Sequence, residues 1–336
     1  MRAAAILMAI LAIGTASSAT AAALDRCRAN LDVLVYNIEG LQWPARRGRA
    51  KSLAQIGEHL RELRSTGKAP DVVLFQEAFS PAAINAVRRT GYAEIVRGPS
   101  RTARSVYKAG TKLPGRKKPL KGEVGVRLLS SGLIIASRYP VLETASDAFS
   151  RLSCAGFDCL SNKGVLLARV SVLGVPEPID IVTTYMNARG ASKVSTKRNL
   201  AAHQAQAREI ADFLKNESRA DRAMIFGGDF NMRRSPERYD AFRTRNPLRL
   251  VHEHCLRVST CQIGLSWDGD QPWMDTQDLQ FFASGEHLRV TPLKVNAMFD
   301  GSPGSPRLSD HDGFRVVYRL EWTGKATGQP RSGSCG

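Results

Sequence analysis

One short stretch, residues 224–231 (MIFGGDFN), most constrains what this chain can fold into. Its three apolar residues are typical of the end of a buried strand, and two glycines let the backbone turn sharply or approach a neighbour closely. Asp229 and Asn231 follow two positions apart, so extended geometry would place both side chains on one side. Because functional side chains often gather where buried strands end, the stretch predicts a catalytic position. An Asp/Asn/Gly turn is the structural alternative.

Polar residues accompany other predicted strands in the same way. Asn37 ends a β-branched and aromatic run, Glu77 directly follows another, and Asp310 and His311 precede a late strand. Hard oxygen ligands with a histidine are typical of magnesium-assisted phosphate chemistry, in which carboxylates hold the ion. A histidine supported by a carboxylate can take a proton from water. The sequence therefore predicts a phosphate-cleaving site assembled from separate segments.

The chain of 336 residues is 43% hydrophobic, enough for a full core, and no repeat or long linker divides it. Residues 1–23 contain Arg2, a short apolar run and small residues before Leu24, which predicts a secretory signal peptide. The apolar run is too short for a membrane span. We expect one catalytic domain over residues 24–323, a flexible tail over residues 324–336, and a soluble monomer that is secreted or periplasmic.

Six cysteines agree with an oxidising compartment. Several connectivities are open, and the simplest is two local pairs and one that joins the ends of the chain. These pairs are Cys154–Cys159, Cys255–Cys261 and Cys27–Cys335. Zinc binding is the competing interpretation, but neither close pair has the two-residue spacing of a zinc ribbon or finger.

The formal net charge is +17, from 48 Lys and Arg against 31 Asp and Glu. Such an excess favours polyanionic partners, namely nucleic acid, an anionic membrane surface or a cell-envelope polymer. Residues 97–127 concentrate the basic side chains around a single acid, Glu123, and their prolines and glycines predict a loop. Both a solvated loop and a contact with an anionic surface fit this segment.

These motifs resemble those of the endonuclease/exonuclease/phosphatase superfamily. The matching residues are Tyr36-Asn37-Ile38, Gln76-Glu77, Gly227-Gly228-Asp229-Phe230-Asn231 and Ser309-Asp310-His311. The resemblance spans residues 31–320 and implies a single-domain, four-layer α/β sandwich, with two packed mixed β-sheets flanked by helices.

The resemblance also implies roles for these residues. Glu77 and Asn37 would bind Mg²⁺ or Mn²⁺. Asp229 would orient or activate water, and Asn231 would contact the phosphate. Asp310 would support His311 as the general base.

A second motif narrows the comparison. Residues 154–164 (CAGFDCLSNKG) resemble a segment of secreted bacterial neutral sphingomyelinases, which implies substrate contacts by Asn162 and Lys163, with Asn187 nearby. This favours a sphingomyelinase-like phosphodiesterase acting on a phospholipid. An extracellular or periplasmic endonuclease of the same superfamily is the alternative. A catalytically inactive binding protein is a third hypothesis, disfavoured because nearly every core position is filled.

The chain also departs from that pattern in three places. Tyr185 stands where those relatives have histidine, so a phenol would donate to the phosphate. The carboxylate expected before Phe281 is out of register, with Asp278 the best candidate for a supporting role and Asp275 the next. The aromatic membrane hairpin of the sphingomyelinases is reduced to residues 297–301. This reduction weakens the expectation of membrane insertion through that hairpin.

Overall fold

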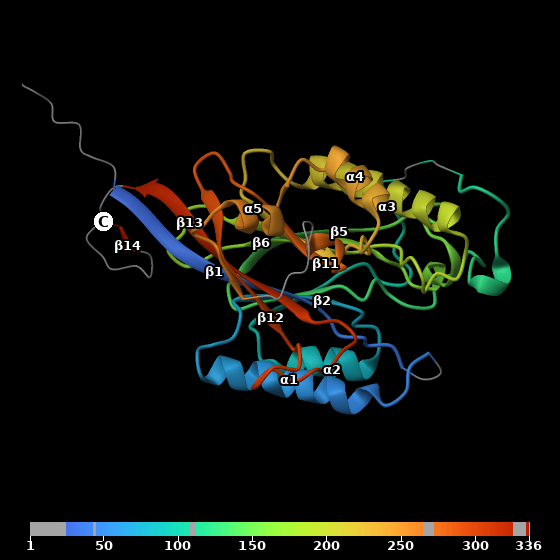
Figure 1. The fold of residues 1–336 in the computed structure, drawn as a ribbon, viewed down its shortest axis with the longest axis horizontal. Helices are drawn as coiled ribbons and strands as arrows, with labels where there is room; N and C mark the ends of the chain where they lie inside the picture. The colour runs from blue at the N-terminus through green and yellow to red at the C-terminus, as the bar shows by residue number, and fades with distance from the viewer. Residues whose placement is uncertain are drawn as a thin grey trace, which may run out of the picture.

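Two β-sheets pack face to face, and helices cover the outer face of each (Figure 1). The computed structural model describes residues 25–42, 45–107, 110, 112–264, 272–324 and 334–335. The expected four-layer α/β sandwich is therefore confirmed, and it forms a single domain. The predicted signal peptide, residues 1–23, lies outside the described residues and stays a prediction.

The first sheet is mixed and contains both ends of the described chain. In spatial order its main strands are β10 (Gln262–Gly264), β12 (Arg289–Met298), β13 (Gly313–Gly324), β1 (Asp25–Asn37), β2 (Val72–Gln76), β4 (Ile134–Ser137) and β3 (Glu94–Arg97). A short strand, β14 (Ser334–Cys335), also pairs with β1. Strands β1 and β2 are parallel, so their carboxyl ends lie at the same edge.

The second sheet is also mixed. Its order is β5 (Val141–Ala148), β6 (Gly164–Val170), β7 (Ile179–Tyr185), β8 (Met224–Asp229), β11 (Asp278–Ala283) and β9 (Arg249–Leu250). Here β7 and β8 are parallel, and β11 runs antiparallel to β8. The carboxyl ends of β7 and β8 thus lie beside the amino end of β11.

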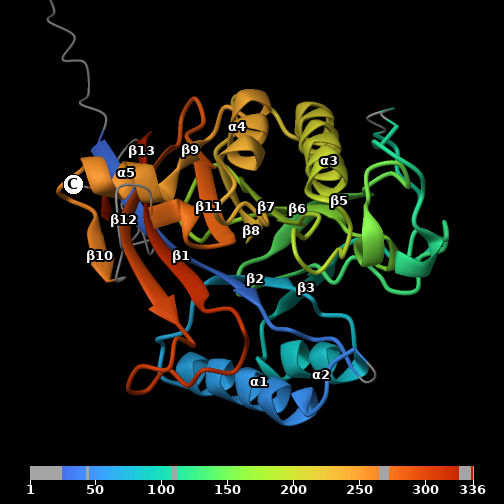
Figure 2. The same cartoon turned by 45° about the vertical axis from the view of Figure 1, so that its right-hand side comes forward.

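Helices form the two outer layers (Figure 2). The helices are α1 (Arg49–Ser65), α2 (Pro81–Arg89), α3 (Thr196–Glu217), α4 (Pro236–Arg245) and α5 (Val251–Arg257), with short 3-10 turns η1 (Pro119–Lys121), η2 (Gly156–Leu160) and η3 (Pro272–Met274). Helices α1 and α2 cover the first sheet, and α3 and α4 cover the second. Helix α2 begins as its sequence predicts: Ser80 accepts a hydrogen bond from Ala83 N at 3.2 Å, and Pro81 is the first helical residue.

Side-chain alternation in β1 explains why the sheets pack on both faces. Val33 and Val35 belong to the core between the sheets, whereas Leu34 and Tyr36 belong to the core under α1 and α2. A strand buried on both faces reads as a continuous apolar run, as residues 33–36 do. By the same alternation Asn37 faces the space between the sheets.

The glycine pair in the central motif allows close packing rather than a turn. Strand β8 continues through both residues to Asp229. A Cβ on Gly227 would lie 2.5 Å from Val35 Cγ2 of the other sheet, and one on Gly228 would lie 2.3 Å from Thr184 O. The glycines therefore let the two sheets and the neighbouring strand β7 approach closely just before the polar residues begin.

Two of the three predicted disulfides are confirmed, Cys154–Cys159 and Cys255–Cys261. The third remains a prediction because the side chain of Cys335 lies outside the described part, although its backbone pairs with that of Cys27. Apart from β14, the predicted tail lies almost wholly outside the described residues. Among the described residues, no helix is long and apolar enough to cross a membrane.

Candidate active site

The predicted polar residues come together between the sheets, where the parallel strands end. Asn37 Nδ2 donates to Glu77 Oε1 at 3.3 Å and to Asp229 Oδ2 at 3.1 Å. His311 Nε2 lies 3.5 Å from the same amide nitrogen. Asn37 thus touches residues that are 40, 192 and 274 positions away in sequence.

Two buried carboxylates face each other across neighbouring strands. Asp278 of β11 is directly opposite Asp229 of β8, and their exposed fractions are 3% and 2%. Like charges in such a pair repel, and burial strengthens the repulsion. Burial and the Asp278 carboxylate raise the pKa of Asp229 to about 7. The pair therefore requires positive charge nearby.

His311 supplies part of that charge and is held firmly. Its Nδ1 lies 2.5 Å from Asp278 Oδ2. Its backbone N–H donates to Ser309 Oγ, and the Ser309 hydroxyl donates to Asn37 O at 2.7 Å. Burial alone lowers the pKa of His311, but the carboxylates around it, above all that of Asp278, outweigh burial and raise the pKa to about 10.

The second ring nitrogen of His311 lies near two side-chain amides. Its Nε2 lies 3.5 Å from Asn37 Nδ2 and 3.5 Å from Gln277 Nε2. Both neighbours are amide groups, so a neutral ring with its proton on Nδ1 would present the Nε2 lone pair to them. Gln277 precedes Asp278 and was not predicted to belong to the site.

Glu77 lies beside this group in an unusual backbone conformation. Its φ is 60°, a left-handed geometry that a glutamate rarely adopts, and it follows the last residue of β2 directly. The break in extended geometry frees its side chain from the alternation of β2. Tyr185 donates its hydroxyl hydrogen to Glu77 Oε1 at 2.6 Å.

That contact changes the expected role of Tyr185. The phenol was expected to donate to the substrate phosphate, but its hydrogen is directed to Glu77. Burial, followed by the negative charge of Glu77, raises the pKa of Tyr185 well above its ordinary value, so the hydroxyl stays neutral. Lys163 Nζ lies 3.3 Å from the centre of the Tyr185 ring.

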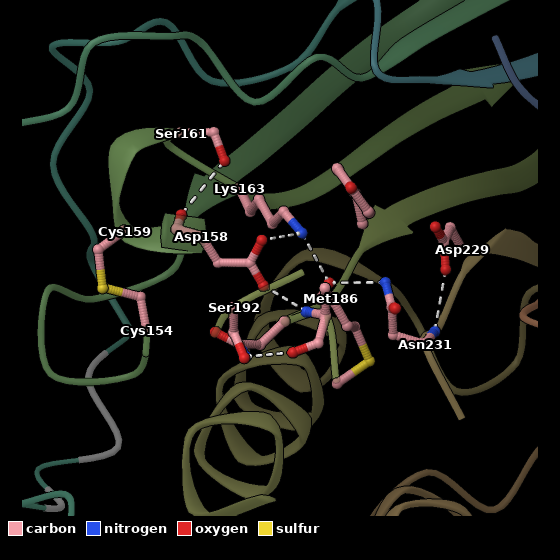
Figure 3. Close-up of polar contacts among 12 residues, drawn as sticks. Cys154, Asp158, Cys159, Ser161, Lys163, Met186, Ser192, Asp229 and Asn231 are labelled. Carbon is pink, nitrogen blue, oxygen red and sulfur yellow. Dashed lines mark hydrogen bonds and ion pairs between the residues drawn. A yellow bond between two sulfur atoms is a disulfide. The ribbon is translucent and has the colours of Figure 1, made fainter. Parts of the chain in front are cut away.

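Asn231 leaves the strand through a turn of its own. Its φ is 53°, and its backbone N–H donates to Asp229 Oδ1 at 3.0 Å. Its side-chain Nδ2 donates to Met186 O at 3.1 Å, away from Asp229 (Figure 3). The two residues therefore adjoin through a local turn, and period-two strand geometry does not apply beyond Asp229.

Asp310 does not support His311 directly. Its side chain is half exposed, and its Oδ2 accepts from Arg46 Nη2 at 3.2 Å. The partner of the histidine is Asp278, which the sequence had suggested only as a possible supporting carboxylate, whereas Asp310 was expected to support His311. Neighbours in sequence point apart here because the backbone of the loop turns between them.

The residues predicted to bind substrate through the 154–164 motif are buried and have protein partners. Asn162 Nδ2 donates to Ser100 O at 2.7 Å, and Asn187 Oδ1 accepts from Ala155 N at 2.9 Å. Lys163 pairs with Asp158 at 3.0 Å and donates to Met186 O (Figure 3). None of the three side chains is more than 4% exposed, so each makes its contacts within the protein, and substrate contact by them stays a prediction.

A cleft of about 390 Å³ opens beside the histidine. Asp278 and His311 line its inner wall, and Gln277, Arg233 and Arg307 line the rest with their neighbours. Four aspartates also line the cleft, namely Asp275, Asp278, Asp310 and Asp312. The cleft therefore combines acidic groups, which suit a metal ion, with two guanidinium groups, which suit an anionic substrate such as a phosphodiester.

The donor set fits a divalent cation. Carboxylate oxygens of Asp229 and Asp278 and a ring nitrogen of His311 lie within 4.8 Å of one another. Asp278 Oδ1 is buried and has no hydrogen-bond partner among the described residues. Glu77 adds a third carboxylate through Asn37. Oxygen ligands with one imidazole are suited to Mg²⁺ or Mn²⁺.

Solved structures share this fold at low sequence identity. Sphingomyelinase C from Streptomyces griseocarneus matches at 18% identity with a TM-score of 0.56, covering 86% of this chain and 99% of that chain. Beta toxin from Staphylococcus aureus with bound magnesium ions matches at 17% identity and a TM-score of 0.55, covering 88% and 100%. TDP2 from D. rerio, complexed with a single-strand DNA product, matches at 17% and 0.54, covering 86% and 98%. These likenesses establish the fold alone.

The family assignment is based on the amino-acid sequence. No curated protein sequence is significantly similar to the chain. A family model nevertheless matches residues 34–311, which include Asn37, Glu77, Asp229 and His311. The chain therefore belongs to the endonuclease/exonuclease/phosphatase family, whose members are metal-dependent hydrolases of phosphodiester bonds.

Proposed function

We propose that the chain is a secreted, sphingomyelinase-like phosphodiesterase that hydrolyses a phospholipid phosphodiester with His311 as the general base. The observation that supports this most directly is the His311–Asp278 pair at 2.5 Å, beside a cleft lined by both arginine and aspartate side chains. A water held at Nε2 would lose its proton to the ring as it attacks phosphorus in line. The Asp278 carboxylate accepts a hydrogen bond from the Nδ1–H group of His311 and so fixes the ring orientation.

The other side chains divide between metal binding and substrate positioning. We assign Glu77, with Asn37 and Asp229 beside it, to a divalent cation that when bound would stabilise charge on the phosphate. Asp278 and His311, which could also ligate a cation, are assigned to proton transfer. Asn231 Nδ2 has a second hydrogen available for a phosphate oxygen, since one is donated to Met186 O. Tyr185 orients Glu77.

Two features favour a phospholipid substrate. Residues 154–164 resemble the corresponding segment of secreted bacterial sphingomyelinases. One of the matching structures is itself named sphingomyelinase C. Secretion is supported by the leader-like residues 1–23 and by the disulfides Cys154–Cys159 and Cys255–Cys261.

A nuclease is the second candidate, because a net charge of +17 favours nucleic acid and the fold is shared with TDP2 bound to DNA. One experiment separates the two. The purified protein is incubated with Mg²⁺ and either sphingomyelin in detergent micelles, plasmid DNA or single-stranded DNA. Release of a water-soluble phosphate headgroup supports the lipid assignment, whereas DNA cleavage without headgroup release replaces it with the nuclease. His311→Ala is the control for contaminating activity.

A further inference from the structure

One end of the molecule combines exposed basic and exposed apolar side chains. This basic–apolar surface comes from residues 101–107, 112–128 and 151–157, which lie opposite the end marked C in Figures 1 and 2. Its exposed basic residues are Arg101, Arg104, Lys112, Arg116, Lys117, Lys118, Lys121 and Arg151. Its exposed apolar residues are Val106, Leu120, Val124, Val126, Leu128, Leu152 and Phe157.

Two adjoining hollows show that the basic side chains gather in space. One has a volume of about 410 Å³ and is lined in part by Lys112, Arg116 and Lys117. The other has a volume of about 820 Å³ and is lined in part by Arg101 and Arg104. Both share Arg127, Arg151 and Leu152, so the two hollows form one continuous cationic surface.

The acids of this region point inward and already have partners. Glu123 is 8% exposed and pairs with Arg198 at 2.6 Å. Asp147 accepts hydrogen bonds from the backbone of Val106 and Tyr107, and Asp158 pairs with Lys163. Within the described part of the chain, no exposed basic residue of this surface forms an ion pair with a carboxylate. The positive charge is therefore not neutralised by the protein itself.

The apolar side chains stand out of the same surface. Leu120 is 98% exposed in η1, between Lys118 and Lys121. Val124, Val126 and Leu128 are each more than half exposed. Among the described residues, most of the strongly exposed large hydrophobic side chains lie on this one surface, which marks it as an interaction site.

Hydrogen bonds fix the basic–apolar surface to the rest of the protein. Asn162 Nδ2 donates to Ser100 O and to Ala103 O, at 2.7 and 2.9 Å. Arg127 Nη1 donates to Cys159 O at 2.7 Å, inside the disulfide loop. Gly156 N donates to Glu123 Oε1 at 2.9 Å. These bonds hold the exposed residues in place for contact with a large partner.

The same anchors connect the surface to the catalytic cleft. Asn162 N donates to Leu129 O, and the next residue, Lys163, lies over the ring of Tyr185. Ala78, which follows Glu77, donates its N–H to Gly132 O at 2.9 Å. The surface thus continues directly into the segments that hold the metal-binding carboxylate.

We propose that the basic–apolar surface docks the enzyme on a phospholipid bilayer that carries anionic headgroups. Interleaved cations and aliphatic side chains match a membrane interface, where headgroups take the charges and the acyl boundary takes Leu120 and its neighbours. Single-stranded nucleic acid would call for stacking rings beside the cations, but the exposed apolar residues are aliphatic except Phe157. The inference rests on the proposed phospholipid substrate. It identifies the surface through which the enzyme would bind the membrane that contains this substrate.

The test measures vesicle binding apart from turnover. Protein in EDTA is sedimented with vesicles of phosphatidylcholine, alone or mixed with phosphatidylglycerol, at low and high salt. We expect salt-sensitive binding to the mixed vesicles. The triple variant Arg116→Gln, Lys117→Gln and Lys118→Gln should weaken it roughly 100-fold, since each basic residue contributes separately. Leu120→Ser should weaken it about tenfold through lost apolar burial.

Matched variants outside the basic–apolar surface are the controls. Arg257→Gln, Arg289→Gln and Lys294→Gln remove three exposed charges from α5 and β12, and Leu142→Ser removes an exposed leucine from β5. Equal losses in test and control variants would overturn the inference. So would absence of binding to the mixed vesicles, or DNA binding that the triple variant abolishes while vesicle binding survives.

Turnover of a water-soluble phosphodiester is measured in parallel. The triple variant should leave it unchanged, because these residues do not line the cleft at His311. Vesicle binding without any phospholipid cleavage would refute the proposed function and leave the docking surface standing. Cleavage of a soluble short-chain phospholipid without vesicle binding would refute the docking surface alone.

Discussion

Tyr185 donates its hydroxyl hydrogen to Glu77 Oε1 at 2.6 Å, which makes the phenol a partner of the proposed metal-binding carboxylate. Glu77 has a left-handed backbone and adjoins three strand ends, so its side chain depends on such contacts for its orientation. The lysine stacked on the phenol ring, Lys163, belongs to the disulfide-bounded motif. Tyr185 therefore contacts both the proposed metal-binding carboxylate, Glu77, and the 154–164 motif through Lys163.

Tyr185→Phe should weaken metal binding more than it slows the saturated reaction. The change removes one hydrogen bond to Glu77 and keeps the ring under Lys163. Losing a partner that orients a metal ligand typically costs about 10–100-fold in metal affinity. Titration of activity with Mg²⁺ measures this. Tyr92→Phe, which loses a bond to Pro70 O far from the cleft, is the matched control. Normal Mg²⁺ dependence in Tyr185→Phe would reduce the residue to a packing role.

Glu77→Gln should nearly abolish activity while the protein stays folded. The amide keeps the size of the side chain but removes the charge that the metal requires. We expect a loss of about 10³-fold or more, in line with removal of a main electrostatic element. Activity on a soluble phosphodiester and the thermal midpoint are measured together. Glu237→Gln, an exposed glutamate in α4, is the control. Near-normal turnover at limiting Mg²⁺ would contradict the metal assignment.

Asp278→Asn and Asp310→Asn should differ sharply. Asp278 holds His311 at 2.5 Å, and replacing the carboxylate of such a pair costs about 10⁴-fold in the serine-protease triad. Asp310 is half exposed and bonded to Arg46, so its variant should lose less than about threefold, the range of an exposed ion pair. Comparable losses in the two variants would restore Asp310 as the supporting acid.

The pH profile gives an independent readout of the same pair. Asp278 raises the pKa of His311, and the protonated ring cannot act as a base. Residual activity of Asp278→Asn should therefore show an acidic limb shifted to lower pH, because the histidine loses its proton more readily. A limb that stays in place or moves to higher pH would exclude His311 as the titrating base.

The sequence predicted the strand ends well but not the relations across strands. Asn37 and Asp229 could be found because each ends a buried apolar run. The partnership of Asp278 with His311 depends on the antiparallel register of β11 against β8, which no local pattern encodes. Asp310 looked suitable by adjacency alone, yet the turn at the loop sends it outward to Arg46.

Three further differences between the sequence analysis and the structure have local physical reasons. Asn162 and Lys163 were assigned to substrate from a motif, but a motif does not say on which side of the surface its polar atoms lie. Strand β12 was not predicted, because a proline and a lysine interrupt its apolar alternation. Helix α4 is largely polar and so lacks the apolar periodicity from which a helix is predicted in sequence.

Peptide mapping without reduction should recover all three predicted disulfides. Cys154–Cys159 and Cys255–Cys261 are formed in the structure, and β14 aligns the backbone of Cys335 with that of Cys27. A protein exported to an oxidising compartment should yield three linked peptides and no thiol that reacts with an alkylating agent. Free Cys27 and Cys335 would refute the end-to-end pair, and free thiols at every position would contradict secretion.

Acid should destabilise the fold through buried histidines outside the catalytic pair. His252 is 1% exposed and stacks on Phe314 at 4.6 Å between ring centres, and burial lowers its pKa to about 3. Below about pH 6.5 the unfolded chain takes up a proton that the folded protein does not, so stability falls as pH falls. His252→Phe keeps the stacked ring and removes the titration. Its free energy of unfolding should lose about 1.4 kcal/mol less per pH unit than that of the wild type between about pH 6 and pH 5.

Denaturant unfolding in EDTA measures the slopes, with the exposed His287→Phe as control. His203, whose pKa burial also lowers, is expected to keep a residual slope in the His252 variant. Parallel slopes for wild type and His252→Phe would mean that His252 is already protonated within the fold.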